Sequence, residues 1–226
     1  MAIQTIVFDF DGTVTVGNGP VLAYAHVLSR SIGSTAATLE KRVAEQLDTA
    51  PGRICAVDAP LDGYDVVRRL SMELGATTEQ LDHAYQMSRT LLGTTAAPIE
   101  APLGLAAFLA ELAPLANLVL VTNSPATNLQ ESLHALGLHR YFAQVIHSAG
   151  KPAGMRAIAS EWLVFGRLLS VGDIWENDLE PVAELGGATA LIGTPPARAD
   201  PTFFASTLPE LYGEIRRWAL AEQLSD

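Results

Sequence analysis

Residues 3–13 read IQTIVFDFDGT and hold the clearest fold signal in the chain. The first six, Ile3–Phe8, form a short, mostly apolar run with β-branched side chains, which is typical of a strand buried within a sheet. Carboxylates follow at once, because Asp9 and Asp11 come where this strand would end, and Gly12 then indicates a turn. We interpret the stretch as a buried strand with a polar site at its carboxyl end.

Working outward, four later apolar runs resemble the first and alternate with helical patterns. Strands that alternate with helices of this size predict right-handed βαβ units and a parallel sheet covered on both faces. The later strands are expected at 118–121, 143–147, 168–171 and 188–192, and the helices at 128–136, 153–162, 179–185 and 208–223.

The segment between the first two expected strands is different, because residues 18–92 contain no strand-like run. Apolar residues recur there at helical spacing and indicate about four helices. Glycine and proline residues flank the segment on both sides and indicate linkers, at Gly17, Gly19, Gly93 and Pro98. We therefore expect an α/β core of residues 1–16 and 97–226, interrupted by a helical insert, 17–96, whose linkers act as hinges. A helical decoration fixed to the core is the alternative.

Composition excludes several classes of protein. The 226 residues include 14 Lys and Arg against 25 Asp and Glu, a net charge of −11, and 49% are hydrophobic. This balance argues against a disordered chain, a nucleic-acid binder and an electrostatic membrane-surface protein. The single cysteine, Cys55, forms no intrachain disulfide, and no signal peptide or spanning segment is visible. We expect a cytoplasmic protein with no membrane partner.

Polar residues follow four of the five expected strands. Because the carboxyl ends of parallel strands meet at one edge of a sheet, these residues are expected to lie together. A single Asp there could be a turn or cap residue, but the joint pattern is poorly explained in that way. The residues are Asp9, Asp11, Thr122, Asn123, Lys151, Asp173 and Asp178.

Carboxylates gathered in this way require a cation. Two like charges about 4 Å apart repel by about 4 kcal/mol at an effective dielectric constant of 20. A few hard oxygen ligands suit Mg²⁺, and no His/Cys cluster indicates a softer metal. Lys151 is one of only two lysines in the chain, and its compact charge suits a phosphoryl oxygen beside a carboxylate. The combination indicates phosphoryl transfer.

Four motifs make the pattern more specific. DFDGT (9–13), VTNS (121–124), GKP (150–152) and VGDIWEND (171–178) resemble, in order and spacing, the motifs of the haloacid dehalogenase-like superfamily. The helical segment resembles the type 1 cap of that superfamily, and the chain is most similar to its phosphoglycolate phosphatase-like members. The resemblance implies a Rossmann-like core, a Mg²⁺ cofactor and a small phosphorylated metabolite as substrate.

The resemblance also implies roles for individual residues. Asp9 would be the nucleophile that becomes an aspartyl-phosphate, and Asp11 the general acid and then the base. Thr122 would hold phosphoryl oxygens, and Lys151 would neutralise developing charge. The implied Mg²⁺ ligands are Asp9, the Asp11 carbonyl oxygen, Asp173 and Asp178.

Further substrate contacts are expected from Thr13, Asn123 and the cap. Arg53 lies in a loop flanked by Pro51 and Gly52, where a cation could grip a second anionic group of the substrate. A solvated surface arginine is an equally good interpretation of Arg53.

Other activities of the superfamily remain in view. Related dehalogenases and phosphonate-cleaving enzymes lack an Asp two residues after the nucleophile, so the presence of Asp11 argues against both. A phosphomutase would share every core residue, and a non-catalytic phosphate- or metal-binding module is a third alternative. The sequence specifies neither the ester nor the oligomeric state.

Overall fold

The computed structural model describes residues 4–33, 36–49 and 60–221, and the chain divides into two compact units. The first unit comprises residues 1–16, 101–124 and 136–226, and the second comprises 17–100 and 125–135. The cap boundaries expected from the sequence, 17–96, stay a prediction. The segment 125–135 had been expected within the core and instead groups with the helical unit.

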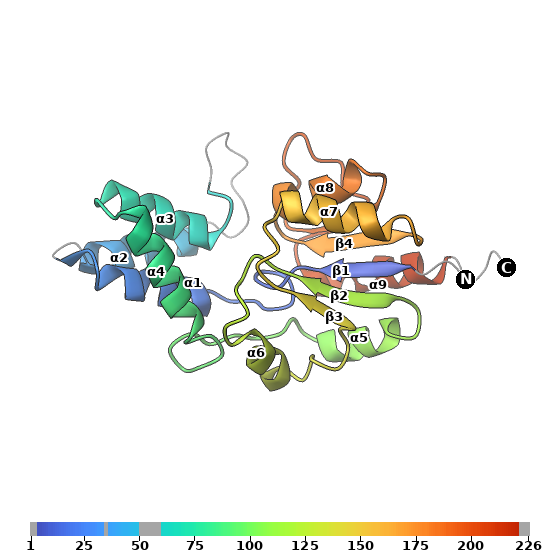
Figure 1. Ribbon diagram of the computed structural model, residues 1–226, viewed down its shortest axis with the longest axis horizontal. Helices are drawn as coiled ribbons and strands as arrows, with labels where there is room; N and C mark the ends of the chain where they lie inside the picture. Colours follow the sequence, from blue (N-terminus) through green and yellow to red (C-terminus); the bar gives the residue numbers. More distant parts are fainter. Residues whose placement is uncertain (1–3, 34–35, 50–59, 222–226) are drawn as a thin grey trace. The chain divides into compact units, whose positions relative to one another are not determined.

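The first unit is built on a sheet that, within the described residues, has six parallel strands in the order β3-β2-β1-β4-β5-β6. Figure 1 shows β3, β2, β1 and β4 of this sheet. The central strand β1 pairs with β2 on one side and with β4 on the other, with Phe8 opposite Leu120 and Val171. The predicted parallel α/β fold is therefore confirmed. The strands are β1 (Thr5–Phe8), β2 (Asn117–Val121), β3 (Gln144–Ile146), β4 (Leu168–Gly172), β5 (Ala188–Ile192) and β6 (Phe203–Ala205).

Alternate residues of the central strand β1 point to opposite sides of the sheet and are buried on both. Val7 and Val119 lie in one fully buried cluster with Met155 and Ala159 of α7. On β1 the next side chain, Phe8, points the other way and meets Phe142 edge to face at 6.1 Å. The helical elements of this unit are α5 (Leu105–Leu112), α7 (Ala153–Trp162), η2 (Trp175–Leu179), α8 (Glu180–Ala183) and α9 (Leu208–Leu220).

The second unit has its own apolar core. Leu28, Leu39, Val67 and Leu81 come from four different helices and are each at most 7% exposed, so they bury one shared interior. Three rings, those of Tyr24, Tyr64 and Tyr85, extend this core at centroid separations of 5.7–6.1 Å. The helices are α1 (Gly19–Ser29), α2 (Ala36–Thr49), α3 (Gly63–Glu73), α4 (Thr78–Arg89) and α6 (Leu129–Ala135).

Two local differences from the expected elements have physical causes. Strand β6 was not expected, because it has three residues and lies at a sheet edge, where Phe204 is 60% exposed. The helix expected at 179–185 begins earlier, as the π-helical turn η2, and continues as α8. None of the described helices has the length and apolar character that crossing a membrane would require.

The Gln4 side chain ties the amino end of β1 to two distant segments. Its amide nitrogen donates to the carbonyl oxygen of Leu115, just before β2, at 2.7 Å. It also donates to the carbonyl oxygen of Ala219, in α9, at 2.6 Å. Gln4 is only 6% exposed, so this one amide satisfies two carbonyl groups from segments far apart in the chain.

We expect Gln4→Ala to lower the free energy of unfolding by about 2–4 kcal/mol, because it removes the donor from both carbonyl groups. Urea unfolding monitored by circular dichroism measures the change. Gln130→Ala is the matched control, because Gln130 is exposed on α6 and its loss is expected to leave stability nearly unchanged. A Gln4→Ala protein as stable as the control would contradict this role.

Candidate active site

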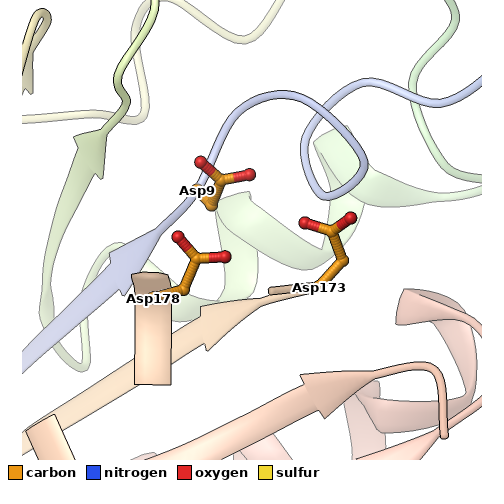
Figure 2. Close-up of side chains that lie close together, drawn as sticks. All are labelled: Asp9, Asp173 and Asp178. Carbon is orange, nitrogen blue, oxygen red and sulfur yellow. The ribbon is translucent and has the colours of Figure 1, made fainter. Parts of the chain in front are cut away.

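Three carboxylates converge beyond the carboxyl ends of β1 and β4. Asp9 directly follows β1, Asp173 directly follows β4, and Asp178 lies in η2. One oxygen from each lies within 4.8 Å of the other two, and Figure 2 shows the three side chains turned toward a common space. Asp9 and Asp178 are 7% and 1% exposed. The predicted meeting of strand-end carboxylates is thus present in the fold.

The ammonium group of Lys151 contacts two of these carboxylates. Its Nζ lies 2.6 Å from Asp9 Oδ1 and 2.6 Å from Asp178 Oδ1, and it donates to the carbonyl oxygen of Val121 at 3.1 Å. The lysine side chain is 3% exposed. Charge-assisted hydrogen bonds of this kind offset much of the cost of burying the three charges.

Glycines at two positions allow the loops to approach closely. A Cβ atom on Gly12 would lie 2.5 Å from Asp173 Oδ2, and the Gly12 φ of +85° also disfavours any other residue. A Cβ atom on Gly172 would lie 2.5 Å from the Cβ of Asp178. Side chains at these positions would therefore displace the carboxylates of Asp173 and Asp178.

The π-helical turn η2 directs Asp178 into the cluster. The Glu180 amide bonds to the carbonyl oxygen of Trp175, five residues back, and Pro181 follows without an amide hydrogen to donate. Within this turn, the Ile174 amide donates to Asp178 Oδ2 at 3.0 Å. The other carboxylate oxygen of Asp178 is the one that contacts Lys151, so both oxygens have a defined partner.

The loop after β2 contributes three consecutive polar side chains with three different partners. The Thr122 hydroxyl accepts from the Ser124 amide at 3.0 Å. The Asn123 side chain accepts from the Lys151 amide at 2.7 Å and donates to the Lys151 carbonyl oxygen at 3.3 Å. Ser124 Oγ donates to Asp11 Oδ2 at 2.7 Å. This loop therefore connects the first and third sequence motifs.

The structure brings some of the predicted site residues together, whereas the roles of others stay predictions and one lies outside the described residues. Asp9, Lys151, Asp173 and Asp178 come together as described, and Asp11 reaches the same loop cluster through Ser124. Thr13 is fully buried. The substrate contacts expected from Thr13, Thr122 and Asn123 stay predictions, and Arg53 lies outside the described residues.

Ser124 was missed by the sequence reasoning as a site residue. The sequence offers only a weak indication of its role, because Ser124 is one more polar residue in a motif that already contains Thr122 and Asn123. Only the parallel pairing of β1 with β2, which brings the two following loops side by side, identifies Asp11 as its partner.

Burial and neighbouring charges alter the acidity of the cluster. Burial raises the pKa of Asp9 to about 7, and the charge of Asp178 adds to this, although the Lys151 ammonium opposes both. The pKa of Lys151 also lies above its usual value, because the two carboxylates outweigh its own burial. Without a metal, the folded protein thus holds a proton on Asp9 more tightly than the unfolded chain does.

The donor set fits a hard divalent cation. Three carboxylates face one ammonium group, so the ionised cluster carries excess negative charge in a mostly buried place. All three offer oxygen donors, which Mg²⁺ prefers, and no nitrogen or sulfur ligand is among them. Asp9, Asp173 and Asp178 are therefore the residues that could hold Mg²⁺.

Comparison with known proteins agrees with this fold. The family model for haloacid dehalogenase-like hydrolases matches residues 3–186, and the chain belongs to that family. A comparison with curated proteins gives no significant match.

Solved structures share the fold at low sequence identity. YfnB from Bacillus subtilis, an inferred HAD-hydrolase whose magnesium-bound crystal form reveals interdomain movement, is 17% identical with a TM-score of 0.62. A predicted phosphoglycolate phosphatase from Haemophilus somnus is 16% identical with a TM-score of 0.62. In both cases 95% of this chain and 99% of the other are covered. The L-2-haloacid dehalogenase from Xanthobacter autotrophicus is 18% identical, covering 95% and 98%, with a TM-score of 0.56.

The raised pKa of Asp9 predicts a pH-dependent effect of Asp9→Asn on stability. A carboxyl group whose pKa is higher in the folded than in the unfolded state opposes folding once it ionises, so the penalty is absent near pH 3 and grows up to about pH 7. We expect Asp9→Asn to raise the Tm of metal-free protein at pH 8, and to raise it less at pH 5.

Thermal unfolding in EDTA at the two pH values measures the effect. Asp82→Asn is the control, because Asp82 is an exposed carboxylate on α4. A lower Tm for Asp9→Asn than for the wild type at pH 8 would contradict the prediction.

Proposed function

We propose that the protein is a Mg²⁺-dependent phosphatase that hydrolyses a small phosphate monoester through an aspartyl-phosphate. The observation that carries this proposal is the buried Asp9 carboxylate, held by Lys151 beside Asp173 and Asp178 and only two residues from Asp11. A nucleophilic carboxylate, a neighbouring carboxyl group and a fixed cation are the groups that phosphoryl transfer through a covalent intermediate requires.

Asp9 is proposed to attack the phosphorus atom of the ester while the bond from phosphorus to the leaving oxygen breaks. Asp11 gives its proton to that oxygen, so that an alcohol leaves. Asp11 then takes a proton from water, which attacks the aspartyl-phosphate, releases inorganic phosphate and restores Asp9. Each proton and each oxygen is thereby accounted for over one turnover.

Lys151 and the β2 loop are proposed to hold the phosphoryl group during these steps. The Lys151 ammonium lies 2.6 Å from the proposed nucleophile, so it also lies next to any oxygen that Asp9 comes to share. The Thr122 hydroxyl accepts from the backbone, which orients it as a donor toward a phosphoryl oxygen. Mg²⁺, held by Asp9, Asp173, Asp178 and the Asp11 carbonyl oxygen, would supply further neutralisation of phosphoryl charge.

The presence of Asp11 favours ester hydrolysis over dehalogenation, although dehalogenases are among the structural neighbours. Removing a halide needs no proton donor for the leaving group, whereas an alkoxide leaves readily only when it is protonated. The neighbours described as a predicted phosphoglycolate phosphatase and a HAD phosphatase support the same choice.

Selection of the ester is proposed to lie with the helical unit. This unit has its own core and is joined to the sheet unit near glycines and prolines, including Gly17 and Pro98. We propose it as the cap, with its boundaries close to 17–96, and Arg53 as a contact for a second anionic group.

The proposal is tested by release of inorganic phosphate from a panel of phosphorylated metabolites, including 2-phosphoglycolate, with Mg²⁺ and with excess chelator. We expect hydrolysis that is lost on chelation and in Asp9→Asn. Phosphorus NMR separates free phosphate from phosphate moved within the substrate, which would instead identify a phosphomutase. Hydrolysis that persists both in chelator and in Asp9→Asn would overturn the mechanism.

The two lysines of the chain provide a matched pair of variants. We expect Lys151→Ala to lower kcat by about 10²–10³, because one fixed charge beside the transferring group is lost. Lys41→Ala is the control, because Lys41 lies on α2 with its side chain 75% exposed. Steady-state hydrolysis of 4-nitrophenyl phosphate measures both, and equal rates for the two variants would refute the role of Lys151.

A further inference from the structure

We infer that Ser124 is a positioning residue that fixes the direction of the Asp11 carboxylate and leaves the catalytic proton on Asp11 Oδ1. The inference rests on the proposed function, because it concerns the same proton transfer to the leaving group. It begins from one contact, the hydrogen bond of 2.7 Å that Ser124 Oγ donates to Asp11 Oδ2.

The Ser124 hydroxyl comes from a rigid anchor. Its residue is 2% exposed, and its backbone is bonded at both ends: the amide donates to Thr122 Oγ1 at 3.0 Å, and the carbonyl oxygen accepts from the Ser148 amide at 2.8 Å. The backbone of Ser124 is thereby fixed, and the bond to Asp11 accounts for the position of its Oγ. A donor held in this way defines a fixed point toward which one carboxylate oxygen turns.

Asp11 depends on such a fixed point more than Asp9 does. The Asp9 carboxylate is 7% exposed and bonded to Lys151, whereas Asp11 is only partly buried. The backbone around Asp11 is already set, because the Gly12 amide donates to Thr15 and the Thr15 amide donates to Phe10. The Ser124 hydroxyl holds one carboxylate oxygen and so favours one of the staggered rotamers of the Asp11 side chain.

The contact also distinguishes the two oxygens of Asp11. As long as Ser124 donates to Oδ2, that oxygen is the acceptor of the bond and does not itself carry a proton toward Ser124. A proton on Asp11 is therefore carried by Oδ1. The same hydrogen bond can persist while Asp11 acts first as an acid and then as a base, so the site needs no rearrangement between the two steps.

The test compares two substrates whose leaving groups differ in their need for a proton, phenyl phosphate and 4-nitrophenyl phosphate. We expect Ser124→Ala to lower kcat for phenyl phosphate by about 10- to 100-fold, the equivalent of one hydrogen bond to a charged group, with KM little changed. The loss with 4-nitrophenyl phosphate, whose leaving group departs readily without protonation, should be much smaller. Ser124→Thr, which keeps the hydroxyl, should restore most of the phenyl phosphate rate.

A double-mutant cycle links the effect to Asp11. Ser124→Ala should have little effect on kcat when combined with Asp11→Asn, because the carboxyl group that it positions is then absent. Ser71→Ala is the control, because Ser71 is equally buried but donates to the carbonyl oxygen of Val67 within α3. If Ser124→Ala does not fold, as judged by circular dichroism, Ser124→Cys is compared on the same two esters.

Equal losses on the two esters, or the same loss with and without Asp11, would overturn the inference and leave Ser124 a structural residue only. The proposed function is judged separately by the wild type. If the wild-type protein with Mg²⁺ hydrolyses neither ester nor any of the phosphorylated metabolites, the phosphatase proposal fails, whereas a hydrolysing wild type with an unaffected Ser124→Ala variant rejects only the role of Ser124.

Discussion

The contact of the Lys151 ammonium group with Asp9 and Asp178 is the interaction on which the arrangement of the site depends. Carboxylates from different loops would repel one another in this mostly buried place, and the amine bridges two of them at 2.6 Å each. One amine cannot balance three ionised carboxylates, so the ionised cluster keeps a net negative charge. Under the proposed function, this arrangement would hold the groups that face a metal and a phosphoryl group in place before either binds.

The short loop after β2 positions residues that come from several other segments of the chain. Thr122 orients its own loop, Asn123 holds the backbone of Lys151, and Ser124 holds the side chain of Asp11. The neighbouring residues of one short segment thus set the positions of groups that come from separate parts of the chain. Parallel pairing makes this possible, because β1 and β2 end at the same level and deliver their loops together.

The sheet and the carboxylates at its edge could be predicted from the sequence. The spacing of apolar residues indicates buried strands, and the polar residues that follow indicate where the strands end. The sequence was insufficient for β6, which is too short and too exposed for a distinct pattern, and for the grouping of 125–135 with the helical unit, which depends on tertiary contacts. Asn123 could be expected at the site, but its bonds to the Lys151 backbone could not. Hydrogen-bond partners depend on distances of tenths of an ångström, whereas residue type and spacing specify only the neighbourhood.

The central position of β1 also affects the order in which the molecule can fold. Both neighbours of β1 come later in the chain, and β4 is separated from it by the helical unit as well as by β2 and β3. During synthesis, both edges of β1 therefore stay unpaired at first. The helical unit can already fold at this stage, because its contacts are closer in sequence than those of the sheet. The strand that leads into Asp9 is thus the first of the sheet to leave the ribosome, but it is enclosed only after β4 has been made.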